Sequence, residues 1–483
     1  MDMMIVKMIN KSRIKTVIGS LFLTLCFTAC SLNIPYENQF SDPDAITTPN
    51  TARELLAAAY KQLPSPEFDL SVLGDDFETT SWISRDASLN NLYKWQTQPI
   101  EDLAVSIWSD YYAAVAIANA VLERVDGISV STTEETKALQ AVVSEAKLLK
   151  AYCYFNLLRL FAPDYEDGPE KDGIILKDQL ELGFLYRSSI EECVTAIREL
   201  LKEALMVENN PSDVYWFSQY SGYYMWAELE LYAHNYEQAA EYAQKVIDEK
   251  GGYDVLGETV YATLWSNSSC AERVFSLFTN SSYYTGINYD THKGDYMTVN
   301  SSLITLYADG DIRSGASVFT KEMTDDALGN TTMENCLGKY NKMNWEKIEL
   351  QYINKYRVAG ACFILAEAYC RDGKGHDGQA VGVMNRYLEQ RNATLLDTQL
   401  SGEPLLKAIF QEKWKEFVGE GERYFDLKRC RKGVLSDWNT SGTMATDKRV
   451  QADDYRWTFP IPRGEYLYNE NVSQNEGWTK IEN

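Results

Sequence analysis

The chain has 483 residues, of which 45% are hydrophobic and 24% charged, a mixture that excludes a disordered, collagen-like or multi-span membrane protein. The 70 Asp and Glu residues outnumber the 46 Lys and Arg residues and give a formal net charge of -24, so we expect no nucleic-acid partner, because such a field repels phosphate backbones. Three histidines leave little room for histidine-based metal or acid–base sites, and we expect neither a cofactor nor a metal.

The first thirty residues have the organisation of an export signal. A basic start is followed by an apolar stretch, residues 16–27, that is too short to span a bilayer as a stable helix. The stretch leads into Ala29-Cys30, which resembles a bacterial lipobox, whose cysteine is lipidated after cleavage. We therefore predict a lipoprotein signal peptide over residues 1–29, a lipid anchor on Cys30 and one domain over residues 30–483. The alternative is an ordinary secretory signal with an incidental cysteine.

Cysteine usage argues against a disulfide framework or a zinc site. Seven cysteines follow Cys30, and an odd number cannot all pair. No C-x-x-C spacing occurs, and several of the seven lie in apolar, helical stretches where a free cysteine behaves as a small hydrophobic residue. The seven are Cys153, Cys193, Cys270, Cys336, Cys362, Cys370 and Cys430.

Helical periodicity dominates the chain and predicts an all-α fold. Between Ala138 and Phe161, apolar residues recur every three or four positions, which predicts one long helix that Pro163 ends. Residues 69–99 and 251–354 lack a sustained helical period and are rich in polar, glycine and aromatic residues, so we expect loops there. Similar periods predict helices over residues 52–63, 107–125, 190–207, 223–233, 236–247, 356–370, 379–390 and 405–417.

Two of the predicted helix pairs have the pattern of a tetratricopeptide unit. In residues 223–247, small residues such as Ala239 and Ala243 stand where the two helices of such a unit meet, around a turn at residues 234–236. Residues 358–391 repeat this scheme around a glycine-rich turn. The two pairs are not consecutive, because the second loop-rich stretch separates them.

Several motifs, in order along the chain, resemble hallmarks of the SusD/RagB family. Residues 412–429 read EKWKEFVGEGERYFDLKR, and residues 145–155 read EAKLLKAYCYF. The chain from residue 30 to 478 is similar to this family of outer-membrane nutrient-binding lipoproteins. The shorter hallmarks are Leu32-Asn33-Ile34-Pro35 near the start and Phe459-Pro460-Ile461-Pro462, Glu465, Asn469 and Gln474-Asn475-Glu476-Gly477-Trp478 near the end.

That resemblance implies a fold, a location and a function. Members of the family are built on tetratricopeptide helix pairs with a loop-rich binding part, and they are lipid-anchored at the surface of Bacteroidetes-type outer membranes. They cap a SusC-like TonB-dependent barrel transporter and deliver oligosaccharides, or in some members peptides, to it without catalysis. We expect the same of this chain, with an oligosaccharide ligand. A peptide or other nutrient ligand is one alternative, and a surface glycosidase is another.

Two further motifs match chemical patterns only in part. Residues 373–378 match the dinucleotide fingerprint, but a predicted helix precedes them where a strand is needed, so we interpret them as a helix–helix turn. Glu412, Glu416 and Glu420 lie four apart on one predicted helix face, whereas a glycosidase needs carboxylates on both sides of one bond. We expect the three to face outward together and to serve in ion pairs and packing. Their expected partners are Lys413, Lys415, Arg423 and Arg429.

Aromatic residues in the two loop-rich stretches are the candidate ligand contacts. A sugar offers C–H groups to a ring face and hydroxyls to polar side chains, and each ring contact contributes on the order of 1 kcal/mol by analogy with aromatic pairs. We expect Trp82 and Trp95 to be the strongest contacts, with Asp75 and Asp76 among the polar side chains beside them. The alternative is that the rings anchor the loops to the helical body. The other candidates are Tyr93, Arg85 and Asn91 in the first stretch and Tyr283, Tyr284, Tyr289 and Tyr296 in the second.

Overall fold

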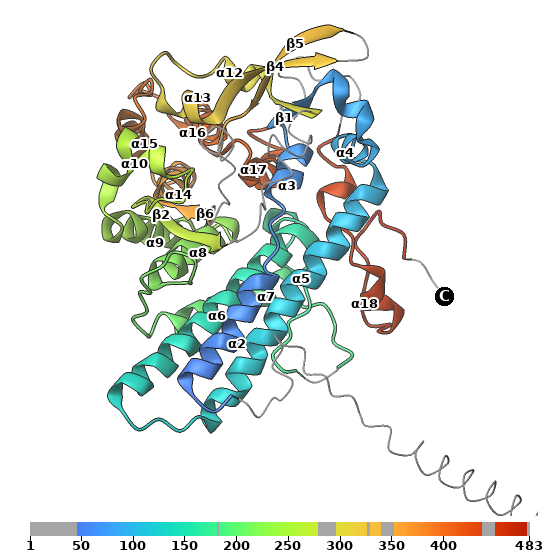
Figure 1. The fold of residues 1–483 in the computed structure, drawn as a ribbon, viewed down its shortest axis with the longest axis vertical. Helices are drawn as coiled ribbons and strands as arrows, with labels where there is room; N and C mark the ends of the chain where they lie inside the picture. Colours follow the sequence, from blue (N-terminus) through green and yellow to red (C-terminus); the bar gives the residue numbers. More distant parts are fainter. Residues whose placement is uncertain are drawn as a thin grey trace, which may run out of the picture. The chain divides into compact units, whose positions relative to one another are not determined.

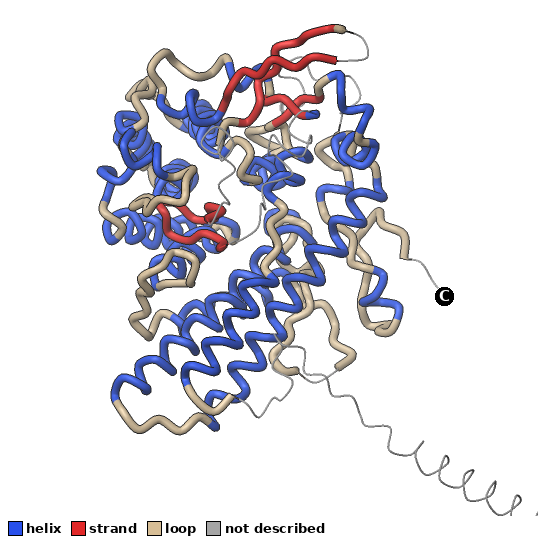
Figure 2. Tube along the Cα trace, viewed as in Figure 1, coloured by secondary structure: helices blue, strands red, loops and turns tan. Residues whose placement is uncertain are grey.

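In the computed structural model of the protein, helices carry most of the regular structure and the strands are short (Figure 2). The structure describes residues 46–180, 183–278, 296–325, 329–339, 352–436 and 450–480. Of a first unit, Met1–Ile46, only the last residue is described, so the predicted signal peptide and Cys30 lie outside the described residues. The second unit is Thr47–Asn483. Its architecture confirms the predicted all-α fold of tetratricopeptide-like helix pairs.

Long helices form one side of this unit, namely α2 (Pro49–Gln62), α5 (Thr97–Arg124), α6 (Thr133–Phe161) and α7 (Ile190–Ala204). α2 packs against α5 and α6, which lie side by side in Figure 1, and α7 packs against α6. α6 begins at a capping box of Thr132 and Glu135 and ends just before Pro163, as predicted. α5 is long and apolar enough to cross a membrane by length and composition alone, and it packs against α2 and α6.

The two tetratricopeptide-like pairs are confirmed as helix hairpins, and they lie next to each other. α8 (Gln219–Tyr232) pairs with α9 (Tyr236–Glu249), and α14 (Val358–Arg371) pairs with α15 (Asp377–Gln390). α14 also packs against α9, so hairpins far apart in the sequence are neighbours in space (Figure 1). The approach of α14 to α8 requires a glycine, because a Cβ on Gly360 would lie 2.1 Å from the Tyr224 hydroxyl oxygen. Residues 373–378 form the turn between α14 and α15 and the start of α15, as predicted. Gly373 and Gly375 in this turn have positive φ.

The remaining helices complete the body. Three of them, α3, η2 and α4, lie within residues 69–99 or overlap them, so the prediction of a loop there is wrong. Each has five to seven residues, fewer than two turns, and so gives no sustained period in the sequence. The set is α3 (Glu67–Leu73), η2 (Ser81–Arg85), α4 (Ala87–Tyr93), η3 (Val125–Gly127), η4 (Tyr165–Asp167), η5 (Gly252–Leu256), α10 (Glu258–Thr263), α12 (Ser301–Ile304), α13 (Ile312–Ser317), α16 (Gly402–Phe417), α17 (Glu422–Cys430), η8 (Tyr455–Trp457) and α18 (Arg463–Leu467).

Antiparallel strand pairs occupy much of the second stretch expected to be a loop, which corrects that prediction too. Each pair forms its own two-stranded sheet. The pairing of β1 with β3 joins the first stretch to the second, so it places residues from both in one part of the molecule. The pairs are β1 (Phe77–Thr79) with β3 (Met297–Val299), β2 (Arg273–Phe278) with β6 (Tyr352–Arg357), and β4 (Val318–Asp325) with β5 (Asn330–Leu337).

A cluster of buried ion pairs fixes α16 against the strands and against the end of α15. The prediction that its three glutamates face outward is wrong, because cations from distant parts of the chain pair with them in the interior; of the expected partners, Lys415 binds one of them. Burial raises the pKa of Glu416, but the charges of Arg391 and Arg357 outweigh it and hold that pKa well below its ordinary value. The pairs, at 2.5 to 3.0 Å, are Glu412 with Arg313 and Lys415, Glu416 with Arg357 and Arg391, and Glu420 with Arg357 and Lys339.

Candidate functional site

The two aromatic stretches meet at the β1–β3 ribbon. Glu78 lies opposite Thr298 in that ribbon, and just beyond it the Thr80 amide donates to the Tyr296 carbonyl at 3.0 Å. The Thr80 hydroxyl accepts a hydrogen bond from the Trp82 amide at 3.3 Å and so caps η2. The structure therefore brings Trp82 and Tyr296, predicted from separate stretches, to adjoining positions of the backbone.

Four of the predicted contact residues reach solvent in this region, and we call Trp82, Arg85, Asn91 and Tyr296 the Trp82 surface. Trp82 and Tyr296 are half-buried, whereas Arg85 and Asn91 are exposed. The Arg85 guanidinium lies 4.1 Å from the centroid of the Trp82 ring, and this cation–π pair orients both groups. Asp86 caps α4, the helix that carries Asn91, by accepting a hydrogen bond from a backbone amide of its first turn.

Tyr93 and Trp95 are anchors in this structure, which corrects their predicted role as ligand contacts. Each is only 1% exposed. The Trp95 indole N–H donates to the Leu73 carbonyl at 3.0 Å, and its ring centroid lies 4.6 Å from that of Trp457 and 6.2 Å from that of Tyr424. The rings of Trp457 and Tyr424 come from the C-terminal part of the chain, so Trp95 fastens the first stretch to the helical body. This is the alternative role, as an anchor of the loop, that the sequence analysis left open.

Asp75 and Asp76 are also buried, and their carboxylates bind groups of the scaffold. Asp75 accepts two hydrogen bonds from Arg423, at 2.7 and 3.0 Å. Asp76 accepts from the Trp414 indole N–H at 2.9 Å and from the Gly419 amide at 3.0 Å. Burial raises the pKa of Asp76 to about 6, although the Gly419 amide opposes the rise. Neither residue reaches the Trp82 surface as a ligand-binding group.

Tyr283, Tyr284 and Tyr289 lie outside the described residues, and their role stays a prediction. Aromatic side chains that the sequence analysis did not single out gather at one end of the β2–β6 pair. Phe278 is 52% exposed, and its ring centroid lies 5.0 Å from that of Tyr215, which is itself 6.3 Å from that of Tyr352. The run Tyr215-Trp216-Phe217 is the signal that could have drawn attention to this place.

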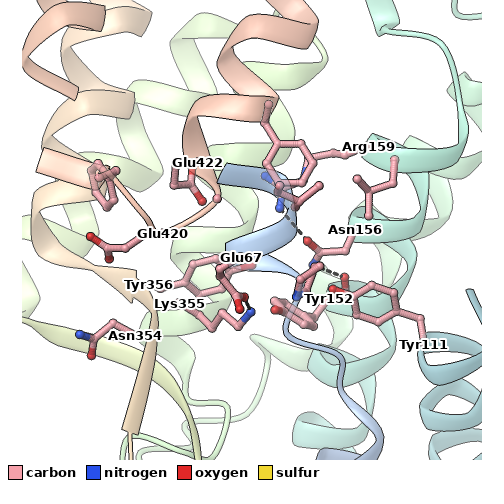
Figure 3. A pocket seen from close by; sticks show the side chains of 16 residues that line it. Glu67, Tyr111, Tyr152, Asn156, Arg159, Asn354, Lys355, Tyr356, Glu420 and Glu422 are labelled. Atoms are coloured by element: carbon pink, nitrogen blue, oxygen red, sulfur yellow. Dashed lines mark hydrogen bonds and ion pairs between the residues drawn. The ribbon is translucent and has the colours of Figure 1, made fainter. Parts of the chain in front are cut away.

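A cavity of about 540 Å³, open solvent included, lies where α3, α6, β6 and α17 meet (Figure 3). Figure 3 shows Lys355 beside Glu67 near its centre, with Tyr111 and Tyr152 to one side. Burial lowers the pKa of Lys355, and the Glu422 carboxylate opposes that change by favouring the charged ammonium. The cavity is therefore lined by phenols and paired charges.

The carboxylates that line this cavity are each paired with a cation. Glu67 pairs with Lys355, Glu422 lies 3.6 Å from the Lys413 ammonium, and Glu420 belongs to the buried cluster on α16. A glycosidase needs one carboxylic acid and one carboxylate facing a shared bond, and ion pairs occupy these oxygens instead. Among the described residues, no group of three or more His, Cys, Asp or Glu side chains is placed to hold a metal ion, and the seven cysteines are free thiols.

Comparison with known proteins identifies the family of this chain. Residues 236–478 match the model of the SusD family, and residues 35–227 match a model described as starch-binding and associating with the outer membrane. The chain belongs to the SusD family. Its predicted membership, made from the motifs alone, is thereby confirmed.

Individual relatives and solved structures agree with this assignment. The SusD-like protein P2 of Formosa agariphila is 24% identical over 421 residues, which cover 77% of this chain and 79% of that protein. A SusD superfamily protein from Bacteroides vulgatus superposes with a TM-score of 0.74 at 22% identity, over 90% of this chain and 100% of the other. A SusD-like carbohydrate-binding protein from the same organism gives 0.71 at 19%, over 88% and 97%. These structures establish the shared fold.

The residues that identify the SusD family serve the scaffold here. Asn475 donates to the carbonyls of Phe161 and Phe459 at 2.8 and 2.7 Å, which ties the C-terminal segment to the end of α6. Gln474 both accepts from the Ile461 amide and donates to its carbonyl, at 2.8 and 2.9 Å. These hydrogen bonds show that the motifs hold the body together, and the Trp82 surface remains the predicted place of ligand contact.

Proposed function

We propose that the protein is a non-enzymatic, lipid-anchored carbohydrate-binding protein of the outer-membrane surface, which captures oligosaccharides and passes them to a SusC-like TonB-dependent transporter. Residues 1–29 serve as the signal peptide, Cys30 carries the lipid, and residues 30–483 form one SusD-like domain. The observation that carries the ligand assignment is the Trp82 surface, a partly exposed indole beside a guanidinium, in a chain of the SusD family.

The Trp82 surface has groups that match both parts of a sugar. The indole offers a broad face to axial C–H groups, while Arg85 and Asn91 supply donors, and Asn91 also an acceptor, for hydroxyls. Trp binds at low entropic cost because only two side-chain torsions need fixing. At a formal net charge of -24 the protein repels polyanions at long range, so the contact face of the ligand is neutral or cationic rather than polyanionic, with Arg85 and Lys94 together able to hold one acidic sugar.

The absence of catalysis is supported by how the carboxylates are used. In the described part of the chain, those that line the cavity of Figure 3 are bound by Lys355, Lys413, Lys339 and Arg357. A general acid or nucleophile needs an oxygen that can reach the scissile bond. The proposal therefore predicts that incubation with bound glycans releases no new reducing ends.

The ligand assignment is tested by a screen of the purified protein against plant, host and microbial glycans and against peptides, followed by Trp82→Ala. We expect the substitution to weaken binding of the best glycan by roughly 1 to 3 kcal/mol, in the range of binding hot spots, with little change in thermal unfolding. Trp226→Ala is a matched control, since this half-buried indole on α8 stacks on Tyr242 at 4.6 Å, outside the Trp82 surface. Equal losses in both variants, or a peptide as the sole ligand, would contradict the proposal.

The transporter assignment is tested by purification from native membranes. We expect a much larger TonB-dependent barrel to co-purify in mild detergent. Stable interfaces of standard size bury about 1,600 Å² in total, so single surface substitutions should rarely release the partner. Recovery of the protein alone under native expression would refute this part and leave the glycan assignment standing.

A further inference from the structure

A second pocket, of about 350 Å³ with open solvent included, lies at the α8–α9 turn and shares no lining residue with the Trp82 surface. Four separate segments line it: η4, the turn between α8 and α9, the end of α14 and the end of α17. The residues are Asp164, Tyr165, Glu166, Leu231, Tyr232, His234, Tyr236, Arg371, Arg429 and Cys430.

Three rings form one wall of this pocket. The His234 ring lies 5.7 Å from Tyr236 at an angle of 18°, and 5.7 Å from Tyr165 at 64°. His234 is exposed, and the two tyrosines are half-buried. The Tyr165 hydroxyl is held by donation to Glu191 at 2.6 Å. The wall is thus a partly exposed, positioned aromatic surface of the kind against which a sugar ring packs.

Two arginine side chains, those of Arg371 and Arg429, also line the pocket. Arg371 and Arg429 share the buried carboxylate of Glu367, and their side chains remain 25% and 20% exposed. Arg371 donates to Glu367 through Nε and to the Cys430 sulfur through Nη2; Arg429 donates to Glu367 and Asp426 through its two Nη atoms. Within the described ranges, Arg371 Nη1 and Arg429 Nε have no hydrogen-bond partner, so each can donate to a ligand.

The charged groups that line the pocket act on the His234 ring. Burial lowers the pKa of His234, Glu166 opposes this change, and Arg371 and Arg429 lower it further. The pocket's own carboxylates differ in their availability. Asp164 is buried and accepts from Arg431 at 3.0 Å, whereas Glu166 is exposed and would repel an anion from that side. A ligand carboxylate is therefore directed to the arginines and away from η4.

We propose that this pocket binds a single sugar residue that carries a carboxylate, a uronic acid, with its ring against His234 and Tyr236 and its carboxylate on Arg371 and Arg429. Guanidinium groups recognise carboxylates through charge-assisted hydrogen bonds. A neutral sugar has no carboxylate and could not form these bonds. The inference rests on the proposed carbohydrate-binding function and adds to it a second site with a different ligand class. One acidic residue within an otherwise neutral glycan would engage it.

The histidine count makes the test direct. His234 is one of three histidines in the chain, so ring resonances of histidine-labelled protein can be followed by NMR during titration with methyl glucuronide, methyl galacturonide, the matching neutral methyl glycosides and inorganic sulfate. We expect a uronide to shift the His234 resonance and raise its pKa, because a bound carboxylate favours the imidazolium, with no response at His376. No shift with either uronide, or equal binding of neutral glycosides or sulfate, would overturn the proposal.

Substitutions separate this site from the Trp82 surface. Arg371→Gln should weaken uronide binding by about tenfold, the effect of one charge-assisted hydrogen bond, and Arg386→Gln on α15 is the matched control without effect. His234→Asn removes a ring while tolerating the φ of 60° at this position, and it keeps the test open if Arg371→Gln fails to fold. Trp82→Ala should leave uronide binding unchanged. If uronide binding is found but glycan binding at Trp82 is not, the proposal for the Trp82 surface is wrong. If glycan binding at Trp82 is found but uronide binding is not, the proposal for this pocket is wrong.

Discussion

Trp95→Ala should destabilise the fold strongly, since the structure buries this side chain almost completely. A Trp side chain removes about 200 Å² from water, which corresponds to about 5 kcal/mol as an upper estimate. Loss of the indole N–H also leaves the Leu73 carbonyl without its donor, at a cost of about 1 kcal/mol. Ala at this position keeps the strained φ of 54°, so the loss comes from the ring. We expect about 4 kcal/mol, within the span of core Trp→Ala substitutions.

The assay is denaturant and thermal unfolding of Trp95→Ala beside Trp82→Ala. For the unit Thr47–Asn483, an unfolding entropy of about 2.1 cal/mol/K per residue turns this loss into a fall of about 4 °C in Tm. Trp82→Ala should change the free energy of unfolding by less than about 1 kcal/mol, because its ring is partly exposed. If Trp95→Ala unfolds like the unsubstituted protein but loses glycan binding, the ring is accessible in solution and the anchor assignment is refuted.

Two other predictions concern the membrane anchor and acid stability. Cys30→Ala should give a protein without acyl chains that no longer fractionates with the outer membrane, since several acyl chains on one cysteine hold firmly; unchanged mass and fractionation would refute this. Burial raises the pKa of Glu367, but the charges of Arg429 and Arg371 outweigh burial and hold this pKa at about 2. The Glu367 carboxylate therefore stabilises the fold above its unfolded pKa of 4.5, and this contribution is lost as the pH falls toward 2. Glu367→Gln should therefore cost about 3 kcal/mol at pH 7, and its difference from the unsubstituted protein, followed by urea unfolding, should shrink below pH 4.5; a difference independent of pH would contradict the argument.

The long helices could be predicted because their evidence is local. In α6, apolar positions recur within one helix and Pro163 marks its end, so twenty-odd neighbouring residues suffice. The hairpins α8–α9 and α14–α15 could be predicted for the same reason. Their contact with each other could not, since the sequence between them gives no sign that α14 packs on α9.

The parts that were predicted wrongly depend on partners far away in the chain. β1 and β3 are three residues each and pair across more than two hundred positions, so neither shows a pattern of its own. Glu416 has the spacing of an exposed helix face, but Arg357 and Arg391 meet it in the interior and make its burial possible. The burial of a charged residue can be predicted only when the positions of its counter-charges are known. Hydrophobic periodicity does not give those positions.

The two tryptophans of the first stretch show why the fold was easier to predict than the site. Trp82 and Trp95 are thirteen positions apart in a segment of similar composition, and both look like rings offered to a ligand. What separates them is that Tyr424 and Trp457 cover Trp95, while Trp82 has the Arg85 guanidinium over its ring and remains partly exposed. Both covering residues lie in the part of the chain that matches the SusD family model, and Tyr424 lies within one of the hallmark motifs. The same scaffold that makes the family recognisable therefore decides which loop aromatics become core, and only the rings that it leaves uncovered can bind a ligand.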